Sequence, residues 1–186
     1  TSVQTGDWSD GSTWDPSGVP QYVDSVVIAN GTAVTLSENA DVNVITINSG
    51  GTFNLNGFRV TVNGDWVNRG TFTPGTATVE FVGSSNSLTG TNTFYNLSKN
   101  VTTASTLIFD GTKTTTVTGT LDLSGALGNP LTLSVNGSSN SDLYIVDGGN
   151  DRIQRFSPSE DAPVFVSAWG TNGTDAGEFD VPHGIG

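Results

Sequence analysis

The sequence has no cysteine and no methionine, and only 13% of its 186 residues carry a charge. Without cysteine there are no disulfides, so a packed core and its hydrogen bonds must hold the fold. Lysine and arginine number 6 against 18 aspartates and glutamates, a formal net charge of −12. An acidic surface repels phosphate groups, so we expect neither nucleic-acid binding nor attachment to anionic membranes. No apolar run reaches the roughly 18 residues of a membrane-spanning helix, so we expect no membrane insertion.

The first residue, Thr1, is not a methionine, which is typical of a processed, secreted protein. A cloned fragment would begin in the same way. We therefore expect an extracellular or cell-surface location. Asn-x-Ser/Thr triplets offer candidate N-glycosylation sites, although such triplets also arise by chance in a chain rich in Asn and Thr. The candidates are Asn30, Asn96, Asn100, Asn136 and Asn172.

Apolar residues recur about every 19 residues in the first half of the chain. Within each period they alternate with polar residues, which indicates short β-strands with one buried face. One such coil cannot bury its apolar face alone, whereas stacked coils share a continuous core. The sequence therefore predicts an all-β parallel β-solenoid over residues 23–138. The predicted core stack consists of three series: Ile28, Ile47 and Trp66; Val34, Phe53 and Phe72; and Val60 with Val79.

Beyond Gly83 the spacing drifts, although segments that alternate or run apolar continue to residue 135. These segments are 93–97, 105–109, 114–119, 119–123 and 130–135. The competing fold is an antiparallel sandwich with a strand every 8–12 residues. The regular step of the first half favours the solenoid.

Residues 1–22 precede the first coil and carry Trp8, Trp14 and Tyr22 among glycines and aspartates. The end of a solenoid exposes an apolar core and unpaired strand edges, which must be covered. We therefore predict that this segment is an N-terminal cap. An exposed aromatic platform for sugars is the functional alternative.

Short motifs in residues 6–135 resemble those of secreted bacterial and archaeal right-handed β-helix proteins. The matching residues are Gly6-Asp7-Trp8-Ser9, Thr13-Trp14-Asp15, Gly18-Val19-Pro20 and Asp24-Ser25-Val26-Val27-Ile28. The resemblance implies a fold and a secreted location. It implies no activity, because such helices carry adhesins, surface filaments and polysaccharide-cleaving enzymes alike.

The last part of the chain, residues 139–186, differs in pattern and resembles one NHL repeat, the blade of a β-propeller. The matching segments are Leu143–Asp147, Asn150–Phe156, Trp169-Gly170, Gly177–Phe179 and Pro182–Ile185. A propeller closes only with several blades, so a lone β-meander leaves open strand edges. The chain could be part of a longer protein, the blade could cap the solenoid, or its strands could be shared with another copy. Strand sharing would use Leu143, Tyr144, Ile145, Ile153, Phe156 and Trp169.

Residues suited to catalysis or metal binding are sparse. A polysaccharide lyase needs clustered carboxylates and a basic residue, but Arg59 and Arg69 are out of phase in the repeat. His183 is the only histidine and cannot form a zinc site alone. Calcium has two weak candidates, residues 147–151 and the N-terminal aspartates Asp7, Asp10 and Asp15; both fit turns better. We therefore predict no catalytic site and no cofactor.

These observations favour an extracellular structural protein, a surface scaffold or filament subunit that binds other copies of itself through exposed strands. A carbohydrate-binding or adhesin module, with extracellular glycans as partners, is the alternative. A polysaccharide-active β-helix enzyme is the third hypothesis.

Overall fold

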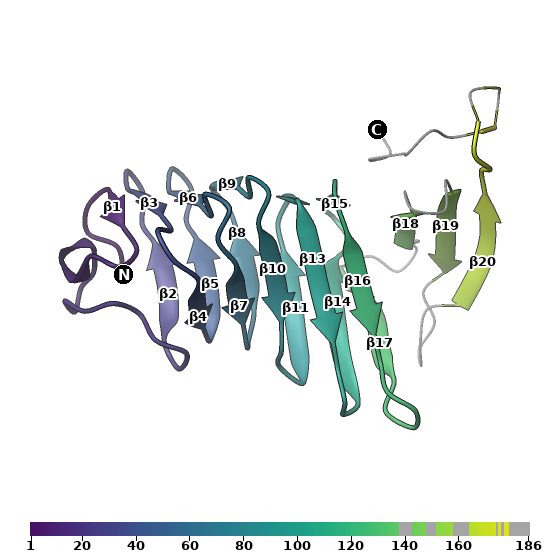
Figure 1. Ribbon diagram of the computed structural model, residues 1–186, viewed down its shortest axis with the longest axis horizontal. Helices are drawn as coiled ribbons and strands as arrows, with labels where there is room; N and C mark the ends of the chain where they lie inside the picture. Colours follow the sequence, from purple (N-terminus) through teal and green to yellow (C-terminus); the bar gives the residue numbers. More distant parts are fainter. Residues whose placement is uncertain (138–142, 148–151, 158–163, 174, 176, 179–186) are drawn as a thin grey trace.

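The computed structural model describes residues 1–137, 143–147, 152–157, 164–173, 175 and 177–178. The chain up to residue 137 forms a parallel β-solenoid of about five turns, stacked along one long axis (Figure 1). Helix is almost absent from the described residues, where it is confined to the short 3₁₀ turn η1 (Gly11–Thr13). None of the described helical residues forms a segment long and apolar enough to cross a bilayer.

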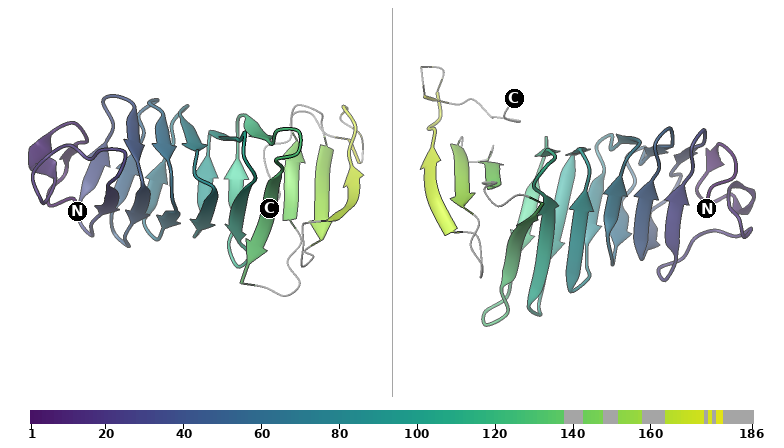
Figure 2. Two further views of the ribbon diagram at one scale, coloured as in Figure 1. Left: turned by 90° about the horizontal axis from the view of Figure 1, so that it is seen from below. Right: turned by 180° about the vertical axis from the view of Figure 1, so that it is seen from behind.

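Each coil contributes strands to three faces (Figures 1 and 2). The six-stranded sheet has the order β17 (Leu131–Asn136), β14 (Ser105–Asp110), β11 (Ser85–Thr89), β8 (Trp66–Asn68), β5 (Val44–Ile47) and β2 (Ser25–Ile28). The five-stranded sheet has the order β16 (Leu121–Ser124), β13 (Asn96–Asn100), β10 (Thr78–Phe81), β7 (Val60–Val62) and β4 (Ala40–Val42). The third face holds β1 (Gly6–Asp7), β3 (Ala33–Thr35), β6 (Thr52–Asn54) and β9 (Thr71–Thr73), and then the pair β12 (Asn92–Phe94) and β15 (Thr115–Val117).

All ladders between these strands are parallel, which rules out the antiparallel sandwich. The inward residues of successive coils pair with each other. Val34 pairs with Phe53, and Phe53 pairs with Phe72, whose ring centroid lies 6.3 Å away. Val60 pairs with Val79 in the same way on the five-stranded sheet. Val34, Phe53, Val60 and Val79 are fully buried, and Phe72 is partly buried against them. Full burial of one such side chain contributes about 1.5–3 kcal/mol, so the stack of coils supplies the core.

One predicted series is offset in its last step. Ile28 pairs with Ile47, as the repeat predicts, but Trp66 pairs with Ile45 and not with Ile47. The reason is that two corners of the second coil are each one residue longer than those of the first. One is the corner between β6 and β7, compared with that between β3 and β4, and the other is the corner between β7 and β8, compared with that between β4 and β5. A shift of two residues keeps the same side of the strand facing inward. Trp66 is therefore fully buried, but its partner is Ile45, two residues before the predicted partner Ile47.

The start of the chain lies over the first coil. Trp8 and Trp14 are buried, with ring centroids 5.0 Å apart in an edge-to-face arrangement. The ring of Trp8 lies 5.6 Å from that of Phe53, and the indole N–H of Trp14 donates to the backbone oxygen of Trp8. The backbone N–H of Ser2 donates to the carbonyl of Val27, on the outer edge of β2. Residues of this segment therefore contact both the core and the outer edge of β2.

A separate antiparallel sheet follows the solenoid. It consists of β18 (Leu143–Asp147), β19 (Arg152–Ser157) and β20 (Val164–Trp169). Within the described residues, no ladder joins it to the solenoid. Ile153 is buried and pairs with Trp169, which is 42% exposed. The side chains of the other strand-sharing candidates, Leu143, Tyr144, Ile145 and Phe156, lie outside the described residues.

Candidate functional site

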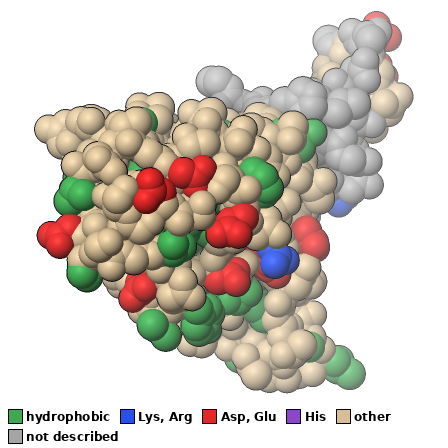
Figure 3. Space-filling model, turned by 60° about the vertical axis from the view of Figure 1, so that its left-hand side comes forward, with side chains coloured by type: hydrophobic (Ala, Val, Ile, Leu, Met, Phe, Trp, Pro, Cys, Tyr) green, Lys and Arg blue, Asp and Glu red, His purple; other side chains and the backbone are tan. Residues whose placement is uncertain are grey.

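The outward side of the five-stranded sheet is a polar surface, which we call the polar face. One residue from each strand lies in a single row across it, in the order Asp41, Thr61, Glu80, Ser98 and Asp122. Adjacent strands lie about 4.8 Å apart, so the carboxylates stand about 10 Å from each other with a hydroxyl between. Acidic side chains outnumber basic ones on the surface seen in Figure 3.

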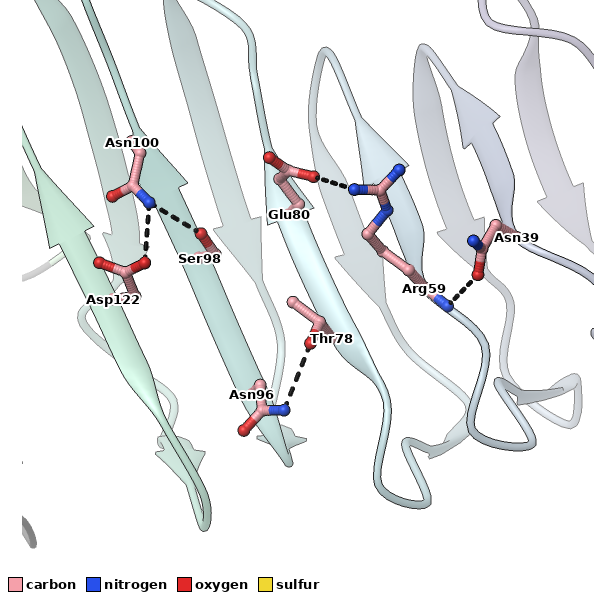
Figure 4. Close-up of polar contacts among 8 residues, drawn as sticks. All are labelled: Asn39, Arg59, Thr78, Glu80, Asn96, Ser98, Asn100 and Asp122. Carbon is pink, nitrogen blue, oxygen red and sulfur yellow. Dashed lines mark hydrogen bonds and ion pairs between the residues drawn. The ribbon is translucent and has the colours of Figure 1, made fainter.

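Side chains on the polar face bridge neighbouring coils (Figure 4). The Nη1 atom of Arg59 lies 3.2 Å from Oε2 of Glu80, one coil further along. The amide of Asn100 donates to Oδ2 of Asp122 at 2.8 Å, again across coils. Within the described residues, Asp41 has no such partner. The face is therefore an array of acids, hydroxyls and amides, in which Glu80 and Asp122 are each engaged by a side chain of a neighbouring coil.

The ion pair between Arg59 and Glu80 is solvent-exposed, with side chains 50% and 30% exposed. Exposed pairs of this kind contribute about 0.2–1 kcal/mol. We expect Glu80→Gln to lower the free energy of unfolding by less than about 1 kcal/mol and to remove part of its salt dependence. Urea denaturation at low and high salt measures both effects. A loss of several kcal/mol would contradict this assignment of the pair as a minor surface contact.

The N-terminal aspartates are held in turns. The carboxylate of Asp7 accepts hydrogen bonds from the hydroxyls of Ser37 and Ser9, and these bonds lower its pKa. Asp10 accepts from the backbone N–H and the hydroxyl of Ser12, which lowers its pKa as well. Asp15 is exposed. Among the described residues, no three metal-ligating side chains come together.

Two sequence candidates for metal binding fall where the structure describes no side chains. His183 lies outside the described residues, and so do residues 148–151 and the side chain of Asp147.

The glycosylation candidates differ in access. Asn100 and Asn136 are exposed, and Asn172 is exposed in the C-terminal part. Asn96 is half-buried, and both atoms of its amide are engaged, with the hydroxyl of Thr78 and a backbone N–H. Asn30 is exposed, but the threonine of its triplet is buried.

A buried polar cluster inside the solenoid was not predicted from the sequence. Lys99 on β13 points inward, and its Nζ donates to the carbonyl of Gly83 and to Oδ1 of Asn86, both at 2.6 Å. The amide of Asn86 in turn donates to the carbonyls of Asn63 and Gly64, in the corner of the preceding coil. Burial lowers the pKa of Lys99. Both side chains are fully buried, so the cluster holds coils together and faces no solvent.

The family model of the G8 domain matches residues 13–135, more than half of the chain. The chain belongs to the G8 domain family. No curated protein and no solved structure matches it. In this G8 domain, the match spans the polar face and the buried cluster of Lys99 and Asn86, and ends before β18 begins.

Proposed function

We propose that this G8 domain is an extracellular structural module, a subunit of a surface scaffold or filament that associates with other copies through exposed β-strands. The observation that supports this most directly is the difference between the two ends of the coil stack. The first coil is overlain by the start of the chain, whose Trp8 and Trp14 are buried. Residues 1–22 would accordingly act as the N-terminal cap.

The last coil is less well covered. Leu97 and Leu107 are almost fully buried, whereas their partners in the last coil, Leu121 and Leu133, are only half-buried. The outer edges of β16 and β17 pair with no strand among the described residues. Open edges and partly exposed leucines together favour the addition of a further strand. This end of the solenoid is therefore the surface through which we expect copies to associate.

The C-terminal sheet offers a second set of edges. Strands β18 and β20 are its outer strands, and the segment resembles a single NHL blade. We propose that it supplies strands to a neighbouring copy, because a three-stranded sheet has little core of its own. Trp169, 42% exposed on β20, is the described side chain best placed for such a contact. Ile153 is already covered within its own chain.

The test is to block the edge of β17 without disturbing its pairing with β14. The carbonyls of Pro130 and Asn136 accept hydrogen bonds from N–H groups at the two ends of β14. Along a strand, alternate residues direct their backbone groups to opposite neighbours. The odd-numbered residues of β17 therefore direct their N–H groups to the free edge. Val135 is one of these. We expect the wild-type protein to form larger species as its concentration rises, and Val135→Pro to remain monomeric, because proline removes the free donor.

Light scattering after size exclusion and electron microscopy measure this association. Val135→Thr is the matched control, since it keeps the N–H group and the shape of the side chain. Circular dichroism must show that both variants are folded. A wild-type protein that stays monomeric at high concentration, or a Val135→Pro variant that assembles equally well, contradicts association through this edge.

A further inference from the structure

Tyr22 is an exposed aromatic residue on the corner of the solenoid where the chain enters β2. Its side chain is 51% exposed, unlike the two buried tryptophans that precede it. Its hydroxyl donates to Oδ1 of Asn63 at 3.1 Å, and the amide of Asn63 donates to Oδ1 of Asn43 at 3.3 Å. The ring is therefore tied at its far end to the coil stack while much of its surface faces solvent.

The neighbours of Tyr22 come from successive coils. Asn43, Asn63 and Val82 directly follow β4, β7 and β10, so they form a column along one corner. The backbone N–H of Asn43 donates to the carbonyl of Asp24, so the chain just before β2 lies at the head of this column. Tyr22 is two residues before Asp24, and its hydroxyl reaches Asn63 in the column. Val82 is 41% exposed. We call Tyr22, Asn43, Asn63 and Val82 the Tyr22 corner.

This corner combines an apolar surface with unused hydrogen-bonding groups. Within the described residues, the side-chain NH₂ of Asn43 makes no hydrogen bond, and the Tyr22 oxygen donates its proton but accepts none. A sugar ring has an apolar face of C–H groups, which packs on an aromatic ring, and hydroxyls that both donate and accept. The Tyr22 corner presents the complementary set of groups.

Charge narrows the choice of glycan. The chain has a net charge of −12, and Asp24, whose backbone carbonyl accepts from the N–H of Asn43, places an acidic residue beside the corner. No lysine or arginine belongs to the corner, so carboxylated or sulfated sugars would be repelled. We propose that the Tyr22 corner binds a neutral glycan, with one sugar ring stacked on Tyr22 and its hydroxyls bonded to Asn43. This binding goes beyond the scaffold role and does not depend on the free edge of β17.

The experiment is affinity electrophoresis of the whole chain in gels that contain a soluble neutral polysaccharide, namely xylan, β-glucan, galactomannan or hydroxyethyl cellulose. Alginate and pectate are the anionic comparisons. We expect at least one neutral polysaccharide to retard the wild-type protein. Tyr22→Ala should weaken this binding on the order of tenfold, because the stacking surface is lost. Tyr22→Phe should keep most of it, since the ring remains.

Tyr95 provides the matched control. It is also exposed, at 37%, but its ring packs beside Gly119, on the corner that leads into β13. Tyr95→Ala should leave glycan binding unchanged, and circular dichroism should show that all three variants are folded. Binding of Tyr22→Ala equal to that of the wild type overturns the proposal, as does a wild type retarded by none of the neutral polysaccharides. Preference for alginate or pectate overturns the charge argument and with it the site. Val135→Pro should bind as the wild type does, which separates this test from that of association.

Discussion

Gly83→Ala is expected to lower the free energy of unfolding by more than about 4 kcal/mol, or to prevent folding. A Cβ atom at this position would lie 1.7 Å from the backbone oxygen of Asn63, in the corner of the preceding coil. The obstacle is a backbone atom, so no side chain can rotate away to make room. Relief requires the two coils to separate where Lys99 and Asn86 also hold them together. Thermal and urea denaturation measure the loss.

Gly128→Ala is the matched control for this substitution. Gly128 lies in the exposed turn between β16 and β17, and a Cβ there would meet no atom within 4 Å. Its φ of +77° is left-handed, so alanine costs only the backbone strain of about 1–2 kcal/mol. We expect Gly83→Ala to be clearly the more damaging of the two. Equal losses would show that the close approach of the coils at Gly83 is not what limits its side chain.

The general architecture could be predicted because apolar side chains repeat at nearly constant intervals in the first coils. Val34, Phe53 and Phe72 follow one another at equal spacing in the sequence, and the structure pairs them as predicted. Later coils break the interval. The step from Leu107 to its partner Leu133 is longer, because the corners have lengthened. Corner length depends on how the backbone turns and not on the apolar pattern, so the register of these coils could not be read in advance.

The polar face could not be predicted from the sequence for the same reason. Its central row advances by unequal steps along the sequence from Asp41 to Asp122, so no fixed period reveals it. Strand β11 escaped prediction because its sequence, Ser85–Thr89, is polar except for Leu88. Its buried Asn86 occupies a place where the pattern calls for an apolar residue. A signal for Lys99 did exist, since it lies two residues after Leu97 and therefore on the same, inward side of the strand.

The aromatic residues before the first coil differ in burial, which sequence alone could not predict. The aromatics that precede the first coil fitted both a cap and a sugar platform. Trp8 and Trp14 are buried against the first coil, whereas Tyr22 is half-exposed and fixed by a hydrogen bond. Composition cannot distinguish these cases, because both depend on the path of the chain before β2.

The second large effect is expected at the buried amide of Asn86. Asn86→Leu should lower the free energy of unfolding by about 3–5 kcal/mol, since it removes one acceptor of a buried amine and the donor to two partly buried carbonyls. The amine is that of Lys99, and the carbonyls are those of Asn63 and Gly64. Urea denaturation at neutral pH measures the loss. A change below about 1 kcal/mol would mean that these bonds are replaced by others of equal strength.

The same cluster predicts a pH dependence. Burial lowers the pKa of Lys99 from its ordinary value of 10.5, so the unfolded chain holds this proton more tightly than the folded protein does. The free energy of unfolding should therefore rise as the pH increases toward 10.5, and its Lys99 contribution should be lost as the pH falls through the folded-state pKa. Lys99→Met removes the group. Its unfolding free energy should be less dependent on pH in this range than that of the wild type, as measured by urea denaturation at a series of pH values.

The double variant connects these two expectations. In the Asn86→Leu background, Lys99 keeps only the carbonyl of Gly83 as an acceptor. Adding Lys99→Met removes the poorly compensated amine and fills the same space with an apolar chain, so part of the lost stability should return. A double-mutant cycle measures this coupling. If the two substitutions are simply additive, Lys99 and Asn86 do not act as a pair, and the inward lysine stabilises the corner through Gly83 alone.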